Sequence, residues 1–396
     1  MKKKVLLRGP FTISSGYGVH ARQIAKWFYD NQDKFEIKFE LTPWGDCYSI
    51  VDTEYDSGLI GWIYQSMVDE QYVKFNAFDL SVQVQLPNEW NPNIAKINIG
   101  VTAGVEATVA NPDWIDSINS MSLVVVPSEF VQSTFETTSK EQGKQISTKI
   151  VVVPEAYDEA FDSEYKPLEI GIDSKFNFLL FGQLTGNSPF NDRKNIPFAI
   201  KWFVEEFKGN PDVGLVIKTS TARAQHMDRR NIAATFQQLL IEIGYDSEKD
   251  PRISIVHGNL SPSEIVGLYG NPTIKALYAP TRGEGWNIPA INAASFGLPV
   301  LATNWSAHTE YLNLGKWIKF DYELKEIHES RVDKNIFMKN AKWAEPKEAD
   351  VKYKLKKFYN DSKIPTEWAN ELKVKIKEKF SIDSVKKHYD KLFLSF

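Results

Sequence analysis

Short apolar runs alternate with segments of helical periodicity along almost the whole chain. The first unit consists of the apolar run 4–8, a polar, glycine-bearing loop at 9–18 and a segment at 20–31 whose apolar residues recur at helical spacing. A short apolar run bounded by turn residues is typical of a strand buried on both faces of a parallel sheet. Strand, loop and helix in this order predict the first unit of a parallel α/β sheet. Further strands are predicted at 36–41, 80–85, 96–102 and 123–126, and further helices at 111–121 and 131–135.

The same alternation begins again after an irregular acidic segment. Residues 155–175 contain Pro167, Gly171 and no clear periodicity, which is typical of a linker. The pattern therefore predicts two α/β domains, which suits a chain of 396 residues. Beyond the linker we expect strands at 176–182, 213–218, 252–257, 276–279 and 299–302, helices at 197–206, 231–243, 262–269 and around 290–296, and a lysine-rich, largely helical end.

Composition indicates an ordinary globular protein. The chain is 42% hydrophobic and 25% charged, as is usual for soluble domains. The apolar stretch near the N-terminus is interrupted by Arg8 and Pro10, which argues against a signal peptide or a membrane span. The single cysteine, Cys47, excludes an internal disulfide and a cysteine-built zinc site. We therefore expect a cytoplasmic protein with no integral membrane association.

Charge is unevenly distributed between the two halves. Residues 1–165 carry 23 acidic and 13 basic residues, whereas residues 166–396 carry 28 acidic and 34 basic residues. The second half is therefore expected to attract an anionic ligand, and the first half is a poor surface for a phosphate backbone or an anionic bilayer.

The most informative stretch runs from Thr281 to Leu312. A predicted strand ends there in a glycine-containing loop, which carries Glu284 and opens a helix. A helix N-terminus offers unpaired amides and the positive end of a dipole, which suit a phosphate or hydroxyl groups. Parallel α/β sheets bind ligands at the carboxyl ends of their strands. The sequence therefore predicts a ligand site around Glu284.

These motifs resemble those of the retaining GT-B glycosyltransferases of family 4. The family hallmark, E-G-F-G-L-P-x-x-E followed by A-x-A-x-G-x-P-V, corresponds to EGWNIPAIN and AASFGLPV at 284–300. The segment 181–207 resembles the family's basic R-K-N stretch, SGYGVHARQIA at 15–25 its glycine-rich donor loop, and VVVPEAYDEAF at 151–161 its domain junction. The likeness extends over nearly the whole chain, and it implies an α/β GT-B architecture with two Rossmann-like domains facing a central cleft.

The resemblance also implies the domain boundaries. We expect an acceptor-side domain at 1–165, a domain for the nucleotide-sugar donor at 166–365, and a helical segment at 366–396 that packs back on the N-terminal domain.

Individual roles follow from the same resemblance. Glu284 would hold hydroxyls of the transferred sugar, and Lys194 and Arg193 would neutralise the diphosphate leaving group, which makes these three the predicted catalytic residues. Glu106 and His20 are candidate acceptor-side residues, and His308 is either ligand-facing or structural. The predicted donor-binding residues are Gly16, Tyr17, Gly18, Gly285, Trp286, Asn287 and Asn292.

Two positions depart from the family pattern. Asn292 stands where the family has the second Glu of its hallmark, which grips the nucleotide ribose, and Gln183 stands where it has an Arg. Asn can still hydrogen-bond a ribose hydroxyl, but as a neutral and weaker partner.

The function that the resemblance implies is retaining transfer of a hexose or pentose from a UDP- or GDP-sugar. We expect no cofactor and no metal, because lysine, arginine and helix ends can stabilise the leaving diphosphate, and the sequence has neither an Asp-x-Asp motif nor a His/Asp cluster with ligand spacing. In the family's front-face mechanism the departing phosphate oxygen takes the acceptor proton. The acceptor is a glycan, a small molecule or a modified DNA base, and the oligomeric state stays open.

Other functions remain compatible with the sequence. The phrases VQLPNEW and NIGVTAGVEAT resemble glycosyltransferases of large tailed phages, which would make hydroxymethylated pyrimidines of DNA the acceptor, in the host cytoplasm. Asn292 and Gln183 are compatible with a catalytically weakened nucleotide-sugar-binding protein. Residues 16–21 also spell the dinucleotide fingerprint G-x-G-x-x-A, but the first glycine lies several residues beyond the predicted strand, where a dehydrogenase has a tight turn.

Overall fold

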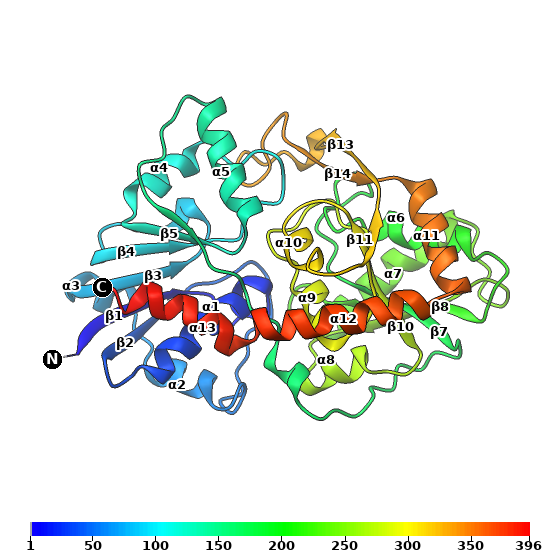
Figure 1. Ribbon diagram of the computed structural model, residues 1–396, viewed down its shortest axis with the longest axis horizontal. Helices are drawn as coiled ribbons and strands as arrows, with labels where there is room; N and C mark the ends of the chain where they lie inside the picture. Colours follow the sequence, from blue (N-terminus) through cyan, green and yellow to red (C-terminus); the bar gives the residue numbers. More distant parts are fainter. Residues whose placement is uncertain (1) are drawn as a thin grey trace. The chain divides into compact units, whose positions relative to one another are not determined.

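The computed structural model describes residues 2–396, which divide into two compact units (Figure 1). Unit 1 runs up to Ala156 and includes Lys334–Met338 and Ile382–Phe396. Unit 2 comprises Tyr157–Asp333 and Lys339–Ser381. The transition after Ala156 lies inside the segment 155–175 that the sequence analysis takes as the linker. Residues 157–165 belong to unit 2, so the transition comes earlier than the predicted boundary after residue 165.

Unit 1 is built on a six-stranded, fully parallel sheet with the order β2-β1-β3-β4-β5-β6. The middle of the sheet is apolar, and residues such as Val5, Leu80 and Ile99 are almost completely buried. Its strands are β1 (Lys3–Gly9), β2 (Phe35–Leu41), β3 (Phe78–Val84), β4 (Ala95–Val101), β5 (Leu123–Val126) and β6 (Ile150–Val152).

Helices cover both faces of this sheet. On one face α1 (Gly16–Asp30), α2 (Leu59–Gln65) and the last helix, α13 (Ile382–Phe393), share one apolar core (Figure 1). On the other face α4 (Asp113–Ser120) and α5 (Glu129–Glu141) pack on β5. The short helix α3 (Glu70–Phe75) adds Val73 to a small third cluster, and η1 (Pro87–Glu89) is a single 3₁₀ turn. Trp27 of α1 donates a 2.8 Å hydrogen bond to Asp390 of α13, which ties the end of the chain to unit 1.

Unit 2 repeats the architecture with a second parallel sheet of six strands, in the order β12-β11-β10-β7-β8-β9. Its strands are β7 (Phe176–Phe181), β8 (Val213–Thr219), β9 (Arg252–His257), β10 (Ile274–Ala279), β11 (Val300–Thr303) and β12 (Ile318–Phe320). A separate antiparallel pair consists of β13 (Tyr322–Glu326) and β14 (Lys342–Pro346).

Two sets of helices sandwich the sheet of unit 2 (Figure 1). One face carries α8 (Pro262–Tyr269), α9 (Ile288–Phe296), α10 (His308–Leu312) and α12 (Lys363–Phe380). The other face carries α6 (Ile196–Glu206), α7 (His226–Glu242) and α11 (Glu348–Asn360). Two 3₁₀ turns, η2 (Glu159–Asp162) and η3 (Glu329–Arg331), complete the unit. Of the helical segment 366–396, which was expected to pack back on the N-terminal domain, the part up to Ser381 belongs to unit 2 and the part from Ile382 belongs to unit 1.

The two parallel sheets confirm the predicted α/β class. Every predicted strand and helix is present, with ends that move by a few residues. Helix α1 begins before the predicted residue 20, because Ser15 caps its N-terminus by accepting a hydrogen bond from the amide of Gly18. The elements that the pattern missed are short, such as β6, β12 and α10. No helix within residues 2–396 is both long and apolar enough to cross a membrane.

All strands of the unit 2 sheet point the same way, so the loops that follow them meet at one edge. We call this edge the carboxyl edge of unit 2. The loop after β7 leads to Arg193 and Lys194, the loop after β10 leads to Glu284, and the loop after β11 leads to His308. Ligands of open α/β sheets bind at this kind of edge.

Candidate functional site

Glu284, Lys194 and Arg193 form one buried ion cluster at the carboxyl edge of unit 2. The ammonium group of Lys194 donates to both carboxylate oxygens of Glu284, at 2.7 Å and 2.9 Å. The guanidinium nitrogen Nη1 of Arg193 lies 3.1 Å from Oε2 of Glu284, whose side chain is 4% exposed. Burial by itself would raise the pKa of Glu284, but the two cations outweigh it and lower that pKa to about 2. The carboxylate is therefore charged at neutral pH, and the cluster carries one net positive charge.

Asp192 fixes the loop that presents the two cations. Its carboxylate accepts hydrogen bonds from the amide and the hydroxyl of Thr185, both at 2.7 Å, and from the amide of Ile196 at 2.8 Å. One side chain thus closes the loop and caps the first turn of α6. The backbone around Arg193 and Lys194 is set by these bonds before any ligand arrives.

Arg282 holds the same loop from the other side. Its guanidinium donates to the carbonyl oxygens of Pro189, at 2.9 Å, and Asp192, at 2.8 Å. It also forms a bidentate pair with Glu345, at 2.7 Å and 2.9 Å. Arg282 is 1% exposed, so its bonds lie in a low-dielectric environment in which such contacts are rigid. Arg282 lies two residues before Glu284, but no motif in the sequence singles it out.

Two residues adopt left-handed backbone conformations beside Glu284. Asn287 has a φ of 75°, and its side chain accepts a 3.3 Å hydrogen bond from Ala290, which caps α9. Ser306 has a φ of 74°, and its hydroxyl accepts a 3.0 Å hydrogen bond from the amide of Glu284. Glycine enters this backbone region without cost, and Asn tolerates it better than most residues. The hydrogen bonds of Asn287 and Ser306 therefore fix the backbone on both sides of the loop.

Trp286 anchors the loop rather than presenting its ring as a platform. The side chain is 4% exposed and packs against Tyr311 and Phe380, with ring centroids 5.0 Å and 5.8 Å apart. The hydroxyl of Tyr311 donates to the carbonyl oxygens of Trp286 and Asn287, at 3.1 Å and 2.9 Å. Gly285 lies between these anchored residues, so the loop Glu284–Asn287 is held at both ends.

Asn292 is already engaged within the chain. Its side-chain oxygen accepts a 3.0 Å hydrogen bond from the amide of Asp158, at the point where the chain enters unit 2. The residue is 6% exposed, and its amide nitrogen has no hydrogen-bond partner within residues 2–396. A ribose contact of Asn292 stays a prediction, and the side chain still offers its amide nitrogen as a donor and the second lone pair of its oxygen as an acceptor.

His308 is a further polar group of the site. Its Nε2 lies 2.7 Å from the carbonyl oxygen of Thr303, while its Nδ1 is buried and has no hydrogen bond in the described part of the chain. Burial lowers the pKa of His308, so the ring is neutral at pH 7. A carbonyl oxygen can only accept, so the proton sits on Nε2 and the lone pair of Nδ1 is left for a donor group. His308 is completely buried, so its contact with a ligand stays a prediction.

In unit 1, Gly16, Tyr17 and Gly18 form the first turn of α1. A Cβ built on Gly18 would lie 1.9 Å from the carbonyl oxygen of Ile13, so only glycine fits there. The hydroxyl of Tyr17 lies 2.8 Å from that of Thr102. Burial raises the pKa of Tyr17, as does the nearby charge of Glu106, a half-buried residue of the loop after β4. The need for Gly18 is therefore explained by packing inside the chain, and the predicted donor contacts of these residues stay predictions.

His20 faces a buried carboxyl group. Its Nδ1 lies 3.7 Å from Oε1 of Glu155, and the two side chains are 1% and 4% exposed. Burial lowers the pKa of His20 to about 4 and raises the pKa of Glu155 to about 8. Both groups are therefore mainly neutral near pH 7.

This pair links stability to pH with a definite sign. The folded pKa of Glu155 lies above its usual 4.5, so the folded chain keeps a proton that the unfolded chain has lost, and stability falls as pH rises from 4.5 to about 8. The folded pKa of His20 lies below its usual 6.5, so its contribution is lost as pH falls from 6.5 to about 4. The two effects oppose each other below pH 6.5, and only that of Glu155 acts between pH 6.5 and 8.

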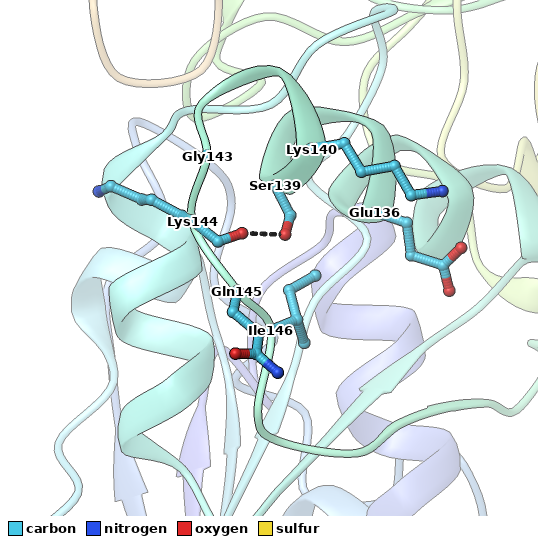
Figure 2. Close-up of a pocket in the computed structure, with 7 residues that line it drawn as sticks. All are labelled: Glu136, Ser139, Lys140, Gly143, Lys144, Gln145 and Ile146. Atoms are coloured by element: carbon cyan, nitrogen blue, oxygen red, sulfur yellow. Dashed lines mark hydrogen bonds between the residues drawn. The ribbon is translucent and has the colours of Figure 1, made fainter.

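The structure thus divides the predicted residues into two groups. Unit 2 holds the ion cluster with the loop Glu284–Asn287 and Asn292, and unit 1 holds the turn Gly16–Gly18 with His20 and Glu106. Figure 2 shows a hollow in unit 1 at the end of α5, which none of these residues lines. It is lined by Glu136, Ser139, Lys140, Gly143, Lys144, Gln145 and Ile146. Among residues 2–396 no group of three or more His, Cys, Asp or Glu side chains is arranged to hold a metal ion.

Comparisons with known proteins agree on the fold. No protein-family model matches the chain, and no curated protein matches it. Solved structures do match it over its full length. Sucrose-phosphate synthase from Thermosynechococcus elongatus has a TM-score of 0.64 at 9% identity, over 100% of this chain and 99% of that one. Anabaena HepE in complex with UDP-glucose has a TM-score of 0.64 at 12% identity, over 100% of both chains.

A third match is the pneumococcal O-GlcNAc transferase GtfA in complex with UDP and GlcNAc, with a TM-score of 0.60 at 11% identity over 99% of each chain. At such low identities the likeness shows the fold alone. The chain therefore has the fold of the GT-B glycosyltransferases, which confirms the predicted GT-B class.

Proposed function

We propose that this protein is a glycosyltransferase that moves a sugar from a nucleotide-sugar donor to an acceptor hydroxyl, with the donor bound at the carboxyl edge of unit 2. The observation that carries the proposal is the buried cluster of Glu284 with Lys194 and Arg193. It lies where α/β sheets bind ligands, in a fold shared with proteins solved with UDP-glucose or UDP bound.

The cluster suits the departure of a nucleoside diphosphate. As the glycosidic bond to the donor phosphate breaks, negative charge grows on the phosphate oxygens. Lys194 and Arg193 are held in place by the Asp192 and Arg282 contacts, so they need no reorganisation to meet that charge. The carboxylate of Glu284 accepts hydrogen bonds from sugar hydroxyls, and the neutral ring of His308 accepts another through Nδ1. The site thereby orients the sugar and stabilises the leaving group.

The finer proposal is retaining transfer of a hexose or pentose from a UDP- or GDP-sugar, by a front-face mechanism without a metal. The family resemblance of 284–300 and 193–195 supports it, as does the presence of two fixed cations that can stabilise the diphosphate. The oxygen that leaves the anomeric carbon accepts the proton of the acceptor hydroxyl, so the reaction needs no separate base.

Consumption of nucleotide sugars tests this proposal. UDP- and GDP-linked hexoses and pentoses are incubated with the protein, with and without EDTA, and the release of nucleoside diphosphate is followed. We expect release from one of these donors, undiminished by EDTA, and its loss in Lys194→Met. Proton NMR of the first product reports the anomeric configuration, which should equal that of the donor. Binding of a donor without turnover under any condition would instead indicate a nucleotide-sugar-binding protein.

A further inference from the structure

Lys218, at the end of β8, is a buried cation without an anionic partner. It is 4% exposed, and no Asp or Glu among residues 2–396 pairs with it. Its ammonium group donates 2.6 Å and 3.4 Å hydrogen bonds to the carbonyl oxygens of Gly258 and Thr219. The same group lies 5.6 Å from the ring centroid of Phe181. Buried charges are rarely surrounded by neutral groups alone, so the burial of Lys218 suggests a functional role.

Desolvation alone accounts for the protonation behaviour of this group. Burial lowers the pKa of Lys218 to about 8, so the side chain is still mainly protonated at pH 7. The chain thus keeps a positively charged donor group buried at the carboxyl edge.

Beside the ammonium group the backbone is open. Gly258 has a φ of 113°, and a Cβ built on it would meet no atom within 4 Å, although the residue itself is buried. Both of its backbone groups are fixed, because its amide donates to Thr219 at 3.2 Å and its carbonyl accepts from Lys218. The hydroxyl oxygen of Thr219 is buried and has no hydrogen-bond partner in the described residues. The open space at Gly258 therefore forms a recess with a fixed backbone. The ammonium group of Lys218 and the unpaired hydroxyl of Thr219 lie beside it.

Gly182 lies next to both Lys218 and the ion cluster. The amide of Gly182 donates to the carbonyl oxygen of Lys218 at 3.0 Å, and a Cβ built on Gly182 would lie 3.6 Å from two side-chain carbons of Lys194. Lys194 and Lys218 thus flank Gly182. Gly258 follows β9, the third neighbour of β10, which is about 14 Å away at the usual strand spacing. That span suits a ligand with its sugar at Glu284 and its diphosphate at Lys194.

We propose that the base of the donor nucleotide binds over Gly258 and that Lys218 selects bases with a ring carbonyl oxygen, such as uracil or guanine. An ammonium group can only donate, so it pairs with a carbonyl oxygen but not with the amino group that cytosine and adenine carry at the equivalent position. This inference rests on the proposed function, since it assumes that the diphosphate lies at Lys194.

The matched ligands are uridine and cytidine diphosphate, which differ at this ring position, and guanosine and adenosine diphosphate form a second such pair. Affinities are measured by titration calorimetry on the full chain. In the wild type the oxo member of each pair should bind at least about tenfold more tightly, as a hydrogen bond to a charged group implies. Lys218→Met should bring the two members within about threefold of each other. The control Lys194→Met should weaken both members equally and leave their ratio unchanged.

Lys218→Gln covers the case in which Lys218→Met does not fold. Its amide can both donate and accept, so it should bind uridine and cytidine diphosphate with similar affinity. A wild type that does not distinguish the paired nucleotides would overturn this inference alone, as would a preference that persists in the folded Lys218 variants. A wild type that binds none of the four nucleotides would overturn the proposed function, and this inference with it.

Discussion

Replacing Glu284 by Gln removes the carboxylate from the ion cluster while keeping its shape. The pKa of Glu284 is lowered from 4.5 to about 2 in the folded chain. This depression corresponds to about 3 kcal/mol of stability at neutral pH, at about 1.4 kcal/mol per pKa unit. The contribution is fully present above pH 4.5 and is lost as pH falls towards 2. Glu284→Gln should therefore lower the melting temperature at pH 7 by about 6–12 °C.

The same substitution should strengthen the binding of a diphosphate. In the wild type Glu284 neutralises one of the two cations, and its removal raises the net charge of the cluster by one. A hydrogen bond to a charged group contributes about 1.5–3 kcal/mol, so pyrophosphate should bind about 10- to 100-fold more tightly to Glu284→Gln. Sugar transfer should be lost, because the carboxylate that orients the sugar hydroxyls is gone.

Thermal denaturation and calorimetric titration with pyrophosphate measure the two effects. The matched control is Glu205→Gln, because Glu205 also pairs with two lysines, Lys352 at 2.5 Å and Lys201 at 3.7 Å, but is 35% exposed. An exposed pair contributes about 0–1 kcal/mol, so the control should melt close to the wild type and bind pyrophosphate unchanged. If Glu284→Gln melts like the wild type and binds pyrophosphate no more tightly, Glu284 does not neutralise these cations and the reasoning fails.

Three further predictions follow from single contacts. Glu155→Gln should remove the loss of stability between pH 6.5 and 8, which is about 1.4 kcal/mol per pH unit in the wild type; an unchanged slope in denaturant titrations across this range would contradict the assignment. Gly18→Ala should lower the melting temperature, because a Cβ there meets a backbone oxygen at 1.9 Å, and a wild-type value would show that α1 can shift. Asn292→Leu should leave a ribose hydroxyl without a partner, so the affinity for a nucleoside diphosphate should fall several-fold while that for pyrophosphate stays the same; parallel changes in both would exclude a ribose contact.

Periodicity was sufficient to predict the two sheets because their strands are continuous apolar runs. Segments such as Phe176–Phe181 and Val213–Thr219 are buried on both faces. They therefore appear in the sequence as apolar runs that alternate with segments of helical periodicity. Elements of three to five residues, such as β12 and α10, are too short to show a period. The end of the chain was predicted as helical. That α12 belongs to unit 2 and α13 to unit 1 depends on tertiary packing, which local sequence patterns do not show.

The candidate site was only partly visible in the sequence. Motif resemblance selected Glu284, Lys194 and Arg193, but not that the three form one ion cluster, because 90 residues separate Lys194 from Glu284. Lys218 was read as the last residue of a strand, and a lysine in that position is usually exposed. In the fold, the ammonium group of Lys218 lies 2.6 Å from the carbonyl oxygen of Gly258. The two residues are 40 positions apart, so no local pattern shows this contact.

The most direct test of the central claim is the release of nucleoside diphosphate from a nucleotide sugar, compared between the wild type and Glu284→Gln. The wild type should release nucleoside diphosphate from at least one UDP- or GDP-linked sugar. Glu284→Gln should release none, although it binds pyrophosphate more tightly. Release by Glu284→Gln at the wild-type rate, or no release by the wild type from any of these donors with a range of acceptors present, would contradict the claim that this cluster is the centre of a glycosyltransferase.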